Sequence, residues 1–560
     1  MADPALARLG VEYLDLYTST EPFTATLWGI PGHDDRVPDP SPAAEAVKRS
    51  RLRAIRERVL AIDADALDDG DRTTWSILEE VTTREIKAID LRFGDLAVSP
   101  FFVGPQAQVL MVVPKARIDG DGAAGDYLVR LRGLPAFFDA YVQRFRTAVA
   151  DGLVPTARSA VDSIAQIDRY LGLPAEADVL RLPLLRAADP AVIAAADVIL
   201  DEQVKPALAR FRDHLRDDVV PHGRDDQHPG LCFLTDRDDR YAAALRAHTT
   251  TDRTPREIHD LGLEIVASLV AEYRDVGGRL LGTTDLAEIF RRLREDPALR
   301  YDDPQEAVTA AQAAVDRAAT RAGGWFGRLP SKPCVVRAIP PVEARGMTVA
   351  YYQPAGDAGE HGTYWINTTE PVLTRYESEA VAFHEALPGH HLQLALQSEL
   401  ALPDFRRLAV NVTAYSEGWA LYAERLADEM SLYSGDLARI GMLATDSLRA
   451  CRLVVDTGIH ALGWSRQRAI DHMLGHTALS EEFVVREVDR YVVLPGQACG
   501  YMIGRLEILR LREQARAALR DRFDVRAFHD VVLSQGCVPL STLDGMVTRW
   551  IDAGGIAASG

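Results

Sequence analysis

The chain has few cysteines, and they are not arranged to hold a metal or a disulfide framework. They are far apart, odd in number, and include no C-x-x-C pair: Cys232, Cys334, Cys451, Cys499 and Cys537. That spacing argues against disulfide cross-links and against a cysteine zinc site. We expect reduced residues of the core.

Long hydrophobic runs are also lacking. No stretch of about 18 apolar residues occurs, which is the length that a membrane-spanning helix needs. The first ten residues lack the basic region and apolar core of a secretory signal. We therefore expect a soluble, cytoplasmic protein without a membrane partner.

Positive charge is in deficit. The sequence has 63 Lys and Arg against 82 Asp and Glu, which gives a formal net charge of −19. Such a chain gains nothing from releasing the counterions of nucleic acid, and anionic lipid repels it. We expect neither partner, and we attribute the charge to solubility. The sequence leaves the oligomeric state open.

What the chain does contain is mostly helical pattern, and residues 1–330 form a helical N-terminal region. Valine and isoleucine recur there at three- and four-residue spacing. Helices are predicted to begin after Ser41, after Thr254 with a capping box to Glu257, and after Asp303. The pair Gly277-Gly278 is interpreted as a helix breaker.

Three short segments differ from this pattern. Residues 335–339, 347–352 and 363–367 are β-branched and aromatic, and prolines and glycines bound them. They predict a small antiparallel sheet. Its last strand could lie beside the metal and pair with an extended substrate backbone. The alternative is that the sheet is only a lid or a joint between domains.

The chain then returns to helical pattern. The predicted helices cover residues 405–430, 446–461, 465–474, 480–493, 497–520, 524–534 and 540–553. The expected fold class is mainly α, a multi-helical metallopeptidase-like architecture with the small sheet just before the helix of the active site. Residues 331–560 are the predicted catalytic, metal-binding region.

The most informative stretch begins at His384-Glu385. In the H-E-x-x-H pattern, two histidines one turn apart bind zinc, and the glutamate after the first is the general base. Here His384 and Glu385 fit, but Pro388 occupies the place of the second histidine. Two histidines follow, His390 and His391.

Helix geometry favours one of these two histidines. On a straight helix, His390 would point to the wrong face and His391 would lie about 10 Å along the axis from His384. Pro388 must open the hydrogen-bond ladder, and Gly389 accepts the backbone angles that follow. A bulge there would place His390 one turn above His384. We expect His390 to be the ligand, with His391 as the alternative; the other one supports the site or contacts substrate.

A third ligand is expected on a separate helix. Glu417 and Glu424 are seven residues apart in an apolar segment, so they share a face. An unpaired carboxylate is costly in such surroundings. Glu417 fits a metal ligand, and Glu424 fits a carboxylate that orients a histidine. The alternative is that Glu417, Glu424 and Asp428 form a solvated stripe.

Supporting groups are predicted further along. Hydrolysis needs a group that stabilises the oxyanion, and Tyr501 is the first candidate, with His460 second. Arg505 lies one turn from Tyr501 and could bind a substrate carboxylate. Each of the three also has a structural interpretation. His529 is interpreted as a core histidine with satisfied nitrogens.

Residues 417–424, EGWALYAE, resemble the third-ligand helix of the thermolysin-like zinc aminopeptidases of the membrane-alanyl type. Together with the HExxPGHH motif at 384–391 and the PGQA run at 495–498, the chain more closely resembles a bacterial family long catalogued as a domain of unknown function. That family looks like zinc metallopeptidases of mostly helical build. The resemblance to the aminopeptidases, in which the first glutamate of this run binds zinc, implies a zinc-ligand role for Glu417.

These observations predict a zinc metallopeptidase, a hydrolase that acts on a peptide or small amide with zinc as its cofactor. Zinc would be held by His384, His390 and Glu417, and Glu385 would be the base. Two other interpretations stay open. One is a metal-dependent amidase or esterase acting on a non-peptide substrate, and the other is a non-catalytic helical binding protein.

Overall fold

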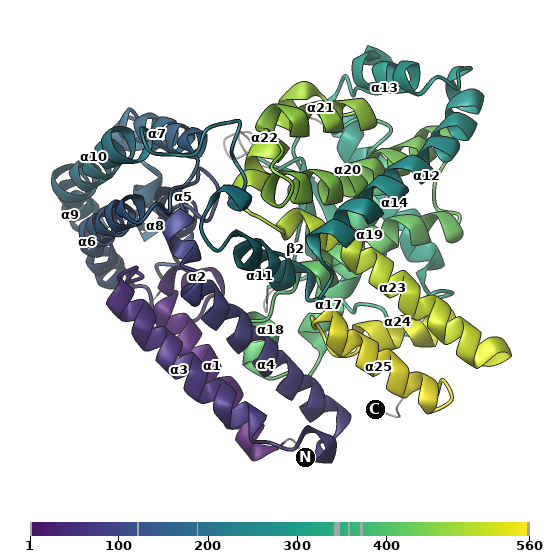
Figure 1. Ribbon diagram of the computed structural model, residues 1–560, viewed down its shortest axis with the longest axis horizontal. Helices are drawn as coiled ribbons and strands as arrows, with labels where there is room; N and C mark the ends of the chain where they lie inside the picture. Colours follow the sequence, from purple (N-terminus) through teal and green to yellow (C-terminus); the bar gives the residue numbers. More distant parts are fainter. Residues whose placement is uncertain are drawn as a thin grey trace. The chain divides into compact units, whose positions relative to one another are not determined.

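The computed structural model describes residues 3–119, 122–187, 189–340, 348–356, 359–369 and 373–556. Helices dominate it, with one small sheet, so the predicted mainly-α fold class is confirmed (Figure 1). The chain forms two compact units. Residues 1–66, 78–243 and 463–466 make the first, and residues 67–77, 244–462 and 467–560 make the second. The boundary expected at residue 330 falls inside the second unit.

The first unit is helical throughout its core. Its large aromatic side chains gather on α6, where Phe137, Phe138 and Phe145 are buried, and Phe211 of α10 packs against them. Its helices are α1 (Pro4–Thr20), α2 (Pro22–Leu27), α3 (Pro42–Leu60), most of α4 (Asp69–Asp90), α5 (Pro105–Val112), α6 (Ala123–Ala150), α7 (Ala157–Leu171), α8 (Leu182–Ala187), α9 (Pro190–Ile199), α10 (Lys205–His214) and the start of α11 (Arg237–Thr249). The predicted cap holds, since Ser41 accepts from the N–H of Ala44.

The second unit holds every candidate site residue. Within it α12 packs along α20, and α19 packs along α23. Its helices are α12 (Pro255–Leu281), α13 (Leu286–Glu295), α14 (Pro304–Ala322), α16 (Ser378–Glu385), α17 (His390–Glu399), α18 (Asp404–Leu408), α19 (Thr413–Glu429), α20 (Asp436–His460), α21 (Arg466–His476), α22 (Glu481–Val493), α23 (Gln497–Leu519), α24 (Val525–Leu533) and α25 (Leu540–Asp552). The capping box predicted at Thr254 and Glu257 is present.

The glycine pair at 277–278 does not break a helix, so that prediction is wrong. Both glycines lie inside α12. A Cβ on Gly277 would collide with the side chain of Ile289 on α13. The missing side chain therefore admits a neighbouring helix, and packing outweighs the low helix propensity of glycine.

The small sheet is mixed, which corrects the expected antiparallel one. Its strands are β1 (Cys334–Ala338), β2 (Ala350–Gln353) and β3 (Gly362–Ile366), in the order β1-β3-β2. β3 is parallel to β1 and antiparallel to β2. The last strand is therefore central and hydrogen-bonded on both sides, so it is not the strand that could accept an extended substrate. Met347 lies outside the described residues.

The single helix predicted over residues 405–430 is two helices, α18 and α19. Between them Val412 takes an extended conformation, and its N–H donates to Sγ of Cys537 at 3.2 Å. A bond to a distant residue thus replaces a turn of helix, and α19 restarts one residue later. Four of the five cysteines are buried and Cys232 is half-buried, and none of the five forms a disulfide, in line with the sequence interpretation.

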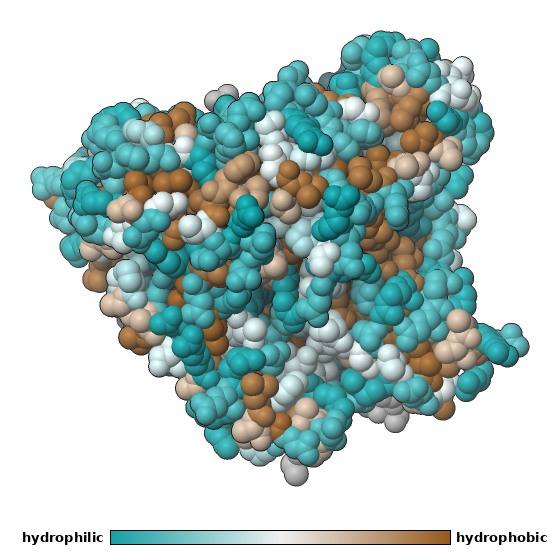
Figure 2. All heavy atoms as spheres, viewed as in Figure 1, coloured by the Kyte–Doolittle hydropathy of each residue, from teal (hydrophilic) through white to brown (hydrophobic). Residues whose placement is uncertain are grey.

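The surface drawn in Figure 2 is largely hydrophilic, with hydrophobic residues interspersed. Among the described residues, none of the helices is both long and apolar enough to span a bilayer.

Candidate metal centre

The site is built around a break between two helices. α16 ends at Glu385 and α17 begins at His390, so the expected bulge is a full turn of non-helical chain. The N–H of His391 donates to the carbonyl of Ala386 at 3.1 Å and holds the turn closed. A Cβ on Gly389 would collide with the carbonyl oxygens of His384 and Phe383. Only glycine fits this close approach of backbone to backbone.

A tryptophan fixes the break to the third-ligand helix. The carbonyl of Pro388 accepts a hydrogen bond of 3.0 Å from the indole Nε1 of Trp419, which is fully buried on α19. A buried carbonyl without a partner would be costly. Trp419 therefore satisfies the break and brings α19, with its neighbour Glu417, against the two histidines. Sequence reasoning used Trp419 only as part of a motif.

Three predicted ligands come together at this point. Glu417 Oε2 lies 3.5 Å from His384 Nε2 and 3.4 Å from His390 Nε2. The two imidazole rings are 4.8 Å apart and perpendicular. One ligand atom from each of the three side chains lies within 4.8 Å of the others, a spacing that a metal ion can bridge. The Glu417 side chain is 25% exposed, so the cluster is open to solvent.

His391 is not part of this cluster. Its Nδ1 pairs with the hydroxyl of Tyr352 on β2 at 2.9 Å. Burial lowers the pKa of His391 to about 4, so the ring is neutral and the hydroxyl donates to it. His391 thus joins α17 to the sheet, while its neighbour His390 faces Glu417.

Glu424 supports the first histidine. Its Oε1 lies 2.8 Å from Nδ1 of His384, and its other oxygen accepts from the hydroxyl of Thr445 on α20. Glu424 is 1% exposed, so the solvated stripe does not include it. This bond orients Nε2 of His384 toward Glu417, as is usual for a carboxylate behind a ligand histidine.

The charges of the cluster are strongly coupled. Burial alone would lower the pKa of His384, but hydrogen bonds to Glu417 and Glu424 outweigh it and raise that pKa to about 9. Burial works against the charge of Glu417 as well, yet the two histidines hold its pKa well below the ordinary value. Glu417 is thus held ionised between two imidazoles, and ionised is the form in which a carboxylate binds a metal.

Glu385 lies at the end of α16, beside the cluster and half-buried. Among the described residues its carboxylate forms no hydrogen bond or ion pair. Burial raises the pKa of Tyr364 on β3, and the negative charge of Glu385 raises it further. The Glu385 carboxylate therefore lies near the sheet.

Tyr501 is brought near Glu417 by a close helix crossing. A Cβ on Gly418 would lie 2.5 Å from Cα of Gly504, so α19 and α23 touch backbone to backbone. Tyr501 is one turn before Gly504 on α23. Burial raises the pKa of Tyr501, and the charge of Glu417 raises it further. The hydroxyl thus shares the environment of the cluster.

The structure places the other two predicted residues elsewhere. Nε2 of His460 bonds to the carbonyl of Tyr491 at 2.9 Å, and the ring is buried. The guanidinium of Arg505 forms a buried ion pair with Asp446. Both have a structural partner outside the three clustered side chains.

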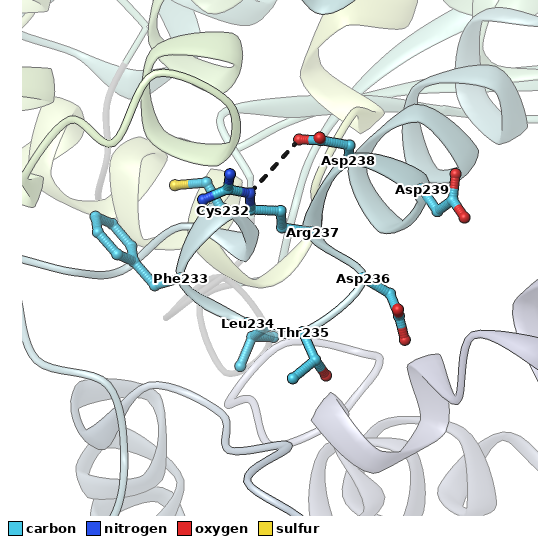
Figure 3. Close-up of a pocket in the computed structure, with 8 residues that line it drawn as sticks. All are labelled: Cys232, Phe233, Leu234, Thr235, Asp236, Arg237, Asp238 and Asp239. Carbon is cyan, nitrogen blue, oxygen red and sulfur yellow. Dashed lines mark ion pairs between the residues drawn. The ribbon is translucent and has the colours of Figure 1, made fainter.

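A separate pocket lies in the first unit, lined by residues 232–239 (Figure 3). Its lining includes Cys232, Phe233 and a string of acidic residues, and Arg237 approaches Asp238 at 3.9 Å. None of the predicted site residues lines it, so it adds nothing to the metal centre.

Comparison with known proteins gives a family and two similar structures. The family model described as "Bacterial protein of unknown function (DUF885)" matches residues 22–547. A crystal structure described as "the putative lipoprotein from Colwellia psychrerythraea" is 28% identical to this chain and gives a TM-score of 0.89. The match spans 98% of this chain and 99% of that structure's chain.

The second structure is described as "a putative lipoprotein of unknown function from Shewanella oneidensis". It is 17% identical to this chain and gives a TM-score of 0.78. The match spans 97% of this chain and 99% of that structure's chain. At this identity the likeness shows the fold alone. No curated protein matches the chain.

Proposed function

Because the chain belongs to the DUF885 family of bacterial proteins, whose description assigns no activity, we propose a function from its site: a zinc-dependent peptidase. The observation that carries this proposal is the meeting of His384, His390 and Glu417, with their ligand atoms within 4.8 Å. His384 lies at the end of α16, His390 begins α17, and Glu417 lies on α19, so three separate helices contribute one ligand each.

The donor set fits zinc. Two imidazole nitrogens and one carboxylate are a usual catalytic zinc set, and three protein ligands leave a coordination position open. Zinc also favours a histidine whose other nitrogen is held by a carboxylate, as Glu424 holds His384. A structural zinc site would use four protein ligands, and the described part of the chain offers three here.

The chain's own residues supply the remaining chemistry. Zinc, when bound, lowers the pKa of water and polarises the scissile carbonyl. Glu385 accepts the proton of the attacking water and then returns it to the leaving amine. Tyr501 would donate a hydrogen bond to the oxyanion as it forms.

The test is the variant Glu385→Gln. The amide keeps the shape of the side chain but cannot accept the proton. Zinc content should stay at the wild-type value, and peptide hydrolysis should fall by at least about 100-fold. The matched control is Glu482→Gln, an exposed glutamate on α22, which should keep full activity.

The substrate panel should contain peptides, simple esters and non-peptide amides. Hydrolysis of peptides by wild type and not by Glu385→Gln supports the proposal. Undiminished activity in Glu385→Gln would overturn the role of the base, and turnover of esters or non-peptide amides alone would reassign the substrate.

A cytoplasmic location stays a proposal. The structure that is 28% identical is described as that of a "putative lipoprotein", which favours the other outcome for this chain. Fractionation of the source bacterium with an antibody to this chain decides it, because a soluble cytoplasmic protein is released by lysis without detergent.

A further inference from the structure

Two arginines on α20 face the candidate oxyanion tyrosine. The guanidinium carbon of Arg452 lies 4.5 Å from the ring centroid of Tyr501, and that of Arg449 lies 5.1 Å from it. The arginines are three residues apart, so they share one face of the helix. Sequence reasoning missed them, because the helix predicted from residue 446 carried no recognisable motif.

The guanidinium groups near Tyr501 outnumber the carboxylates that are paired with them. Nε of Arg452 donates to Tyr491 at 3.0 Å and its Nη2 to Glu487 at 2.7 Å. Arg490 also donates to Glu487, through two bonds of 3.0 and 3.1 Å. One carboxylate therefore serves two guanidinium groups, and Arg449 is left over.

Arg449 forms no hydrogen bond or ion pair with the other described residues. Nε of Arg449 is buried without an acceptor, and so is Nη1 of Arg452. Glu377 acts on Arg449 through space, but the Glu377 carboxyl accepts from Thr374 at 2.5 Å. Buried donors on charged groups are costly without a partner, so these two N–H groups lack an acceptor that an anionic ligand could supply.

The same face of α20 leads to the metal centre. Thr445, one turn before Arg449, donates to Glu424, which bonds to His384. One turn of helix advances about 6 Å and two turns about 11 Å. An extended peptide advances about 3.3 Å per residue. These rises correspond to about two and about three residues of extended peptide, so an anion at this face of the helix matches a group two or three residues beyond the bond that is cleaved.

We propose that Arg449 and Arg452 bind the C-terminal carboxylate of the peptide substrate, so that the enzyme removes residues from the carboxyl end. This inference rests on the proposed peptidase function and names its substrate class. Arg449 makes the direct contact, and Arg452, held by Glu487 and Tyr491, contributes its free Nη1. Both guanidinium groups lie against the Tyr501 ring, and the charge of Glu417 acts on the same tyrosine.

The experiment compares one peptide in three forms: with a free C-terminus, with a C-terminal amide, and with the amide plus a glutamate as last residue. kcat/KM is measured for wild type, Arg449→Gln and Arg449→Lys. Binding of the three forms to zinc-loaded Glu385→Gln is measured by calorimetry. Arg439→Gln is the matched control, because it lies on the same helix with its side chain 45% exposed.

The free acid should be cleaved and bound about 10- to 100-fold better than the amide, as for a hydrogen-bonded charge pair. Arg449→Gln should lose that preference, because it should lower kcat/KM for the free acid much more than for the amide. Arg449→Lys should restore part of it, and Arg439→Gln should retain all of it. Circular dichroism and melting temperature confirm that the variants fold.

Equal handling of acid and amide by wild type, or equal loss for both in Arg449→Gln, would overturn the proposal. Full recovery with the glutamate amide would overturn the terminal carboxylate in favour of an acidic side chain. If no form is cleaved by wild type, the peptidase proposal fails, whereas the calorimetry, repeated with Arg449→Gln in the Glu385→Gln background, still decides whether Arg449 recognises the carboxylate.

Discussion

At the scale of single residues, neighbours decide what each buried histidine does. His384 keeps its charge because two carboxylates face it, and its pKa is raised to about 9 in the absence of a metal. His529 has the opposite surroundings. Its Nδ1 donates to the carbonyl of Trp325 at 2.8 Å, and Nε2 accepts from Tyr422 at 2.7 Å. Burial lowers the pKa of His529 to about 3.

A pH dependence of stability follows from His529. The folded state keeps this ring neutral, while the unfolded chain protonates it below about pH 6.5. Its contribution is therefore complete above pH 6.5 and is lost as the pH falls toward 3. From pH 7 to pH 5 the loss should be about 2 kcal/mol.

Urea denaturation of wild type and His529→Gln at the two pH values, both with chelator, measures this contribution. The variant is expected to be less stable at pH 7 and to lose less stability on acidification. Parallel losses in the two proteins would show that His529 does not carry the effect.

At the scale of elements, the crossing of α19 and α23 brings the site together. A Cβ on Gly418 would meet backbone atoms of Gly504 and Arg505 at 2.5 to 2.9 Å. Backbone cannot move aside as a flexible side chain can. The residues on either side of Gly418 are the ligand Glu417 and the anchor Trp419, so this contact sets the position of both.

Gly418→Ala should therefore cost both stability and metal affinity. Overpacking of this kind destabilises by about 1–3 kcal/mol, and displacement of Glu417 should weaken zinc binding. Gly475→Ala on α21 is the control: its Cβ meets nothing within 4 Å, so it should leave zinc binding unchanged and stabilise by up to about 1 kcal/mol. Denaturation curves and zinc titration compare the two. Equal zinc affinity in both variants would contradict the account.

Local signals predicted these elements well, and contacts between distant residues did not show in them. α22 and α23 end within one residue of the predicted ranges, because caps and prolines act on adjacent chain. The break of 405–430 was missed because it depends on Cys537, 125 residues away from Val412. Gly277-Gly278 looked like a breaker because Ile289 is invisible to a local pattern.

At the scale of the whole molecule, the candidate site draws on several helices of the second unit. α16 and α17 supply the two histidines, α19 supplies Glu417 and Glu424, α20 supplies Thr445, and α23 supplies Tyr501. Sequence motifs could name His384, Glu385 and Glu417, because their spacing is chemically constrained. Arg449 and Arg452 could not be named, since only the packing of α20 on α23 gives them a role.

The most direct test of the central claim is the zinc content of purified wild type, His390→Ala, His391→Ala and Glu417→Ala. The geometry predicts one equivalent in wild type and in His391→Ala, because His391 is turned toward Tyr352. It predicts loss in His390→Ala and Glu417→Ala, whose ligand atoms face His384. Retention of zinc in those two variants, or no zinc in wild type after zinc is offered, would contradict the account.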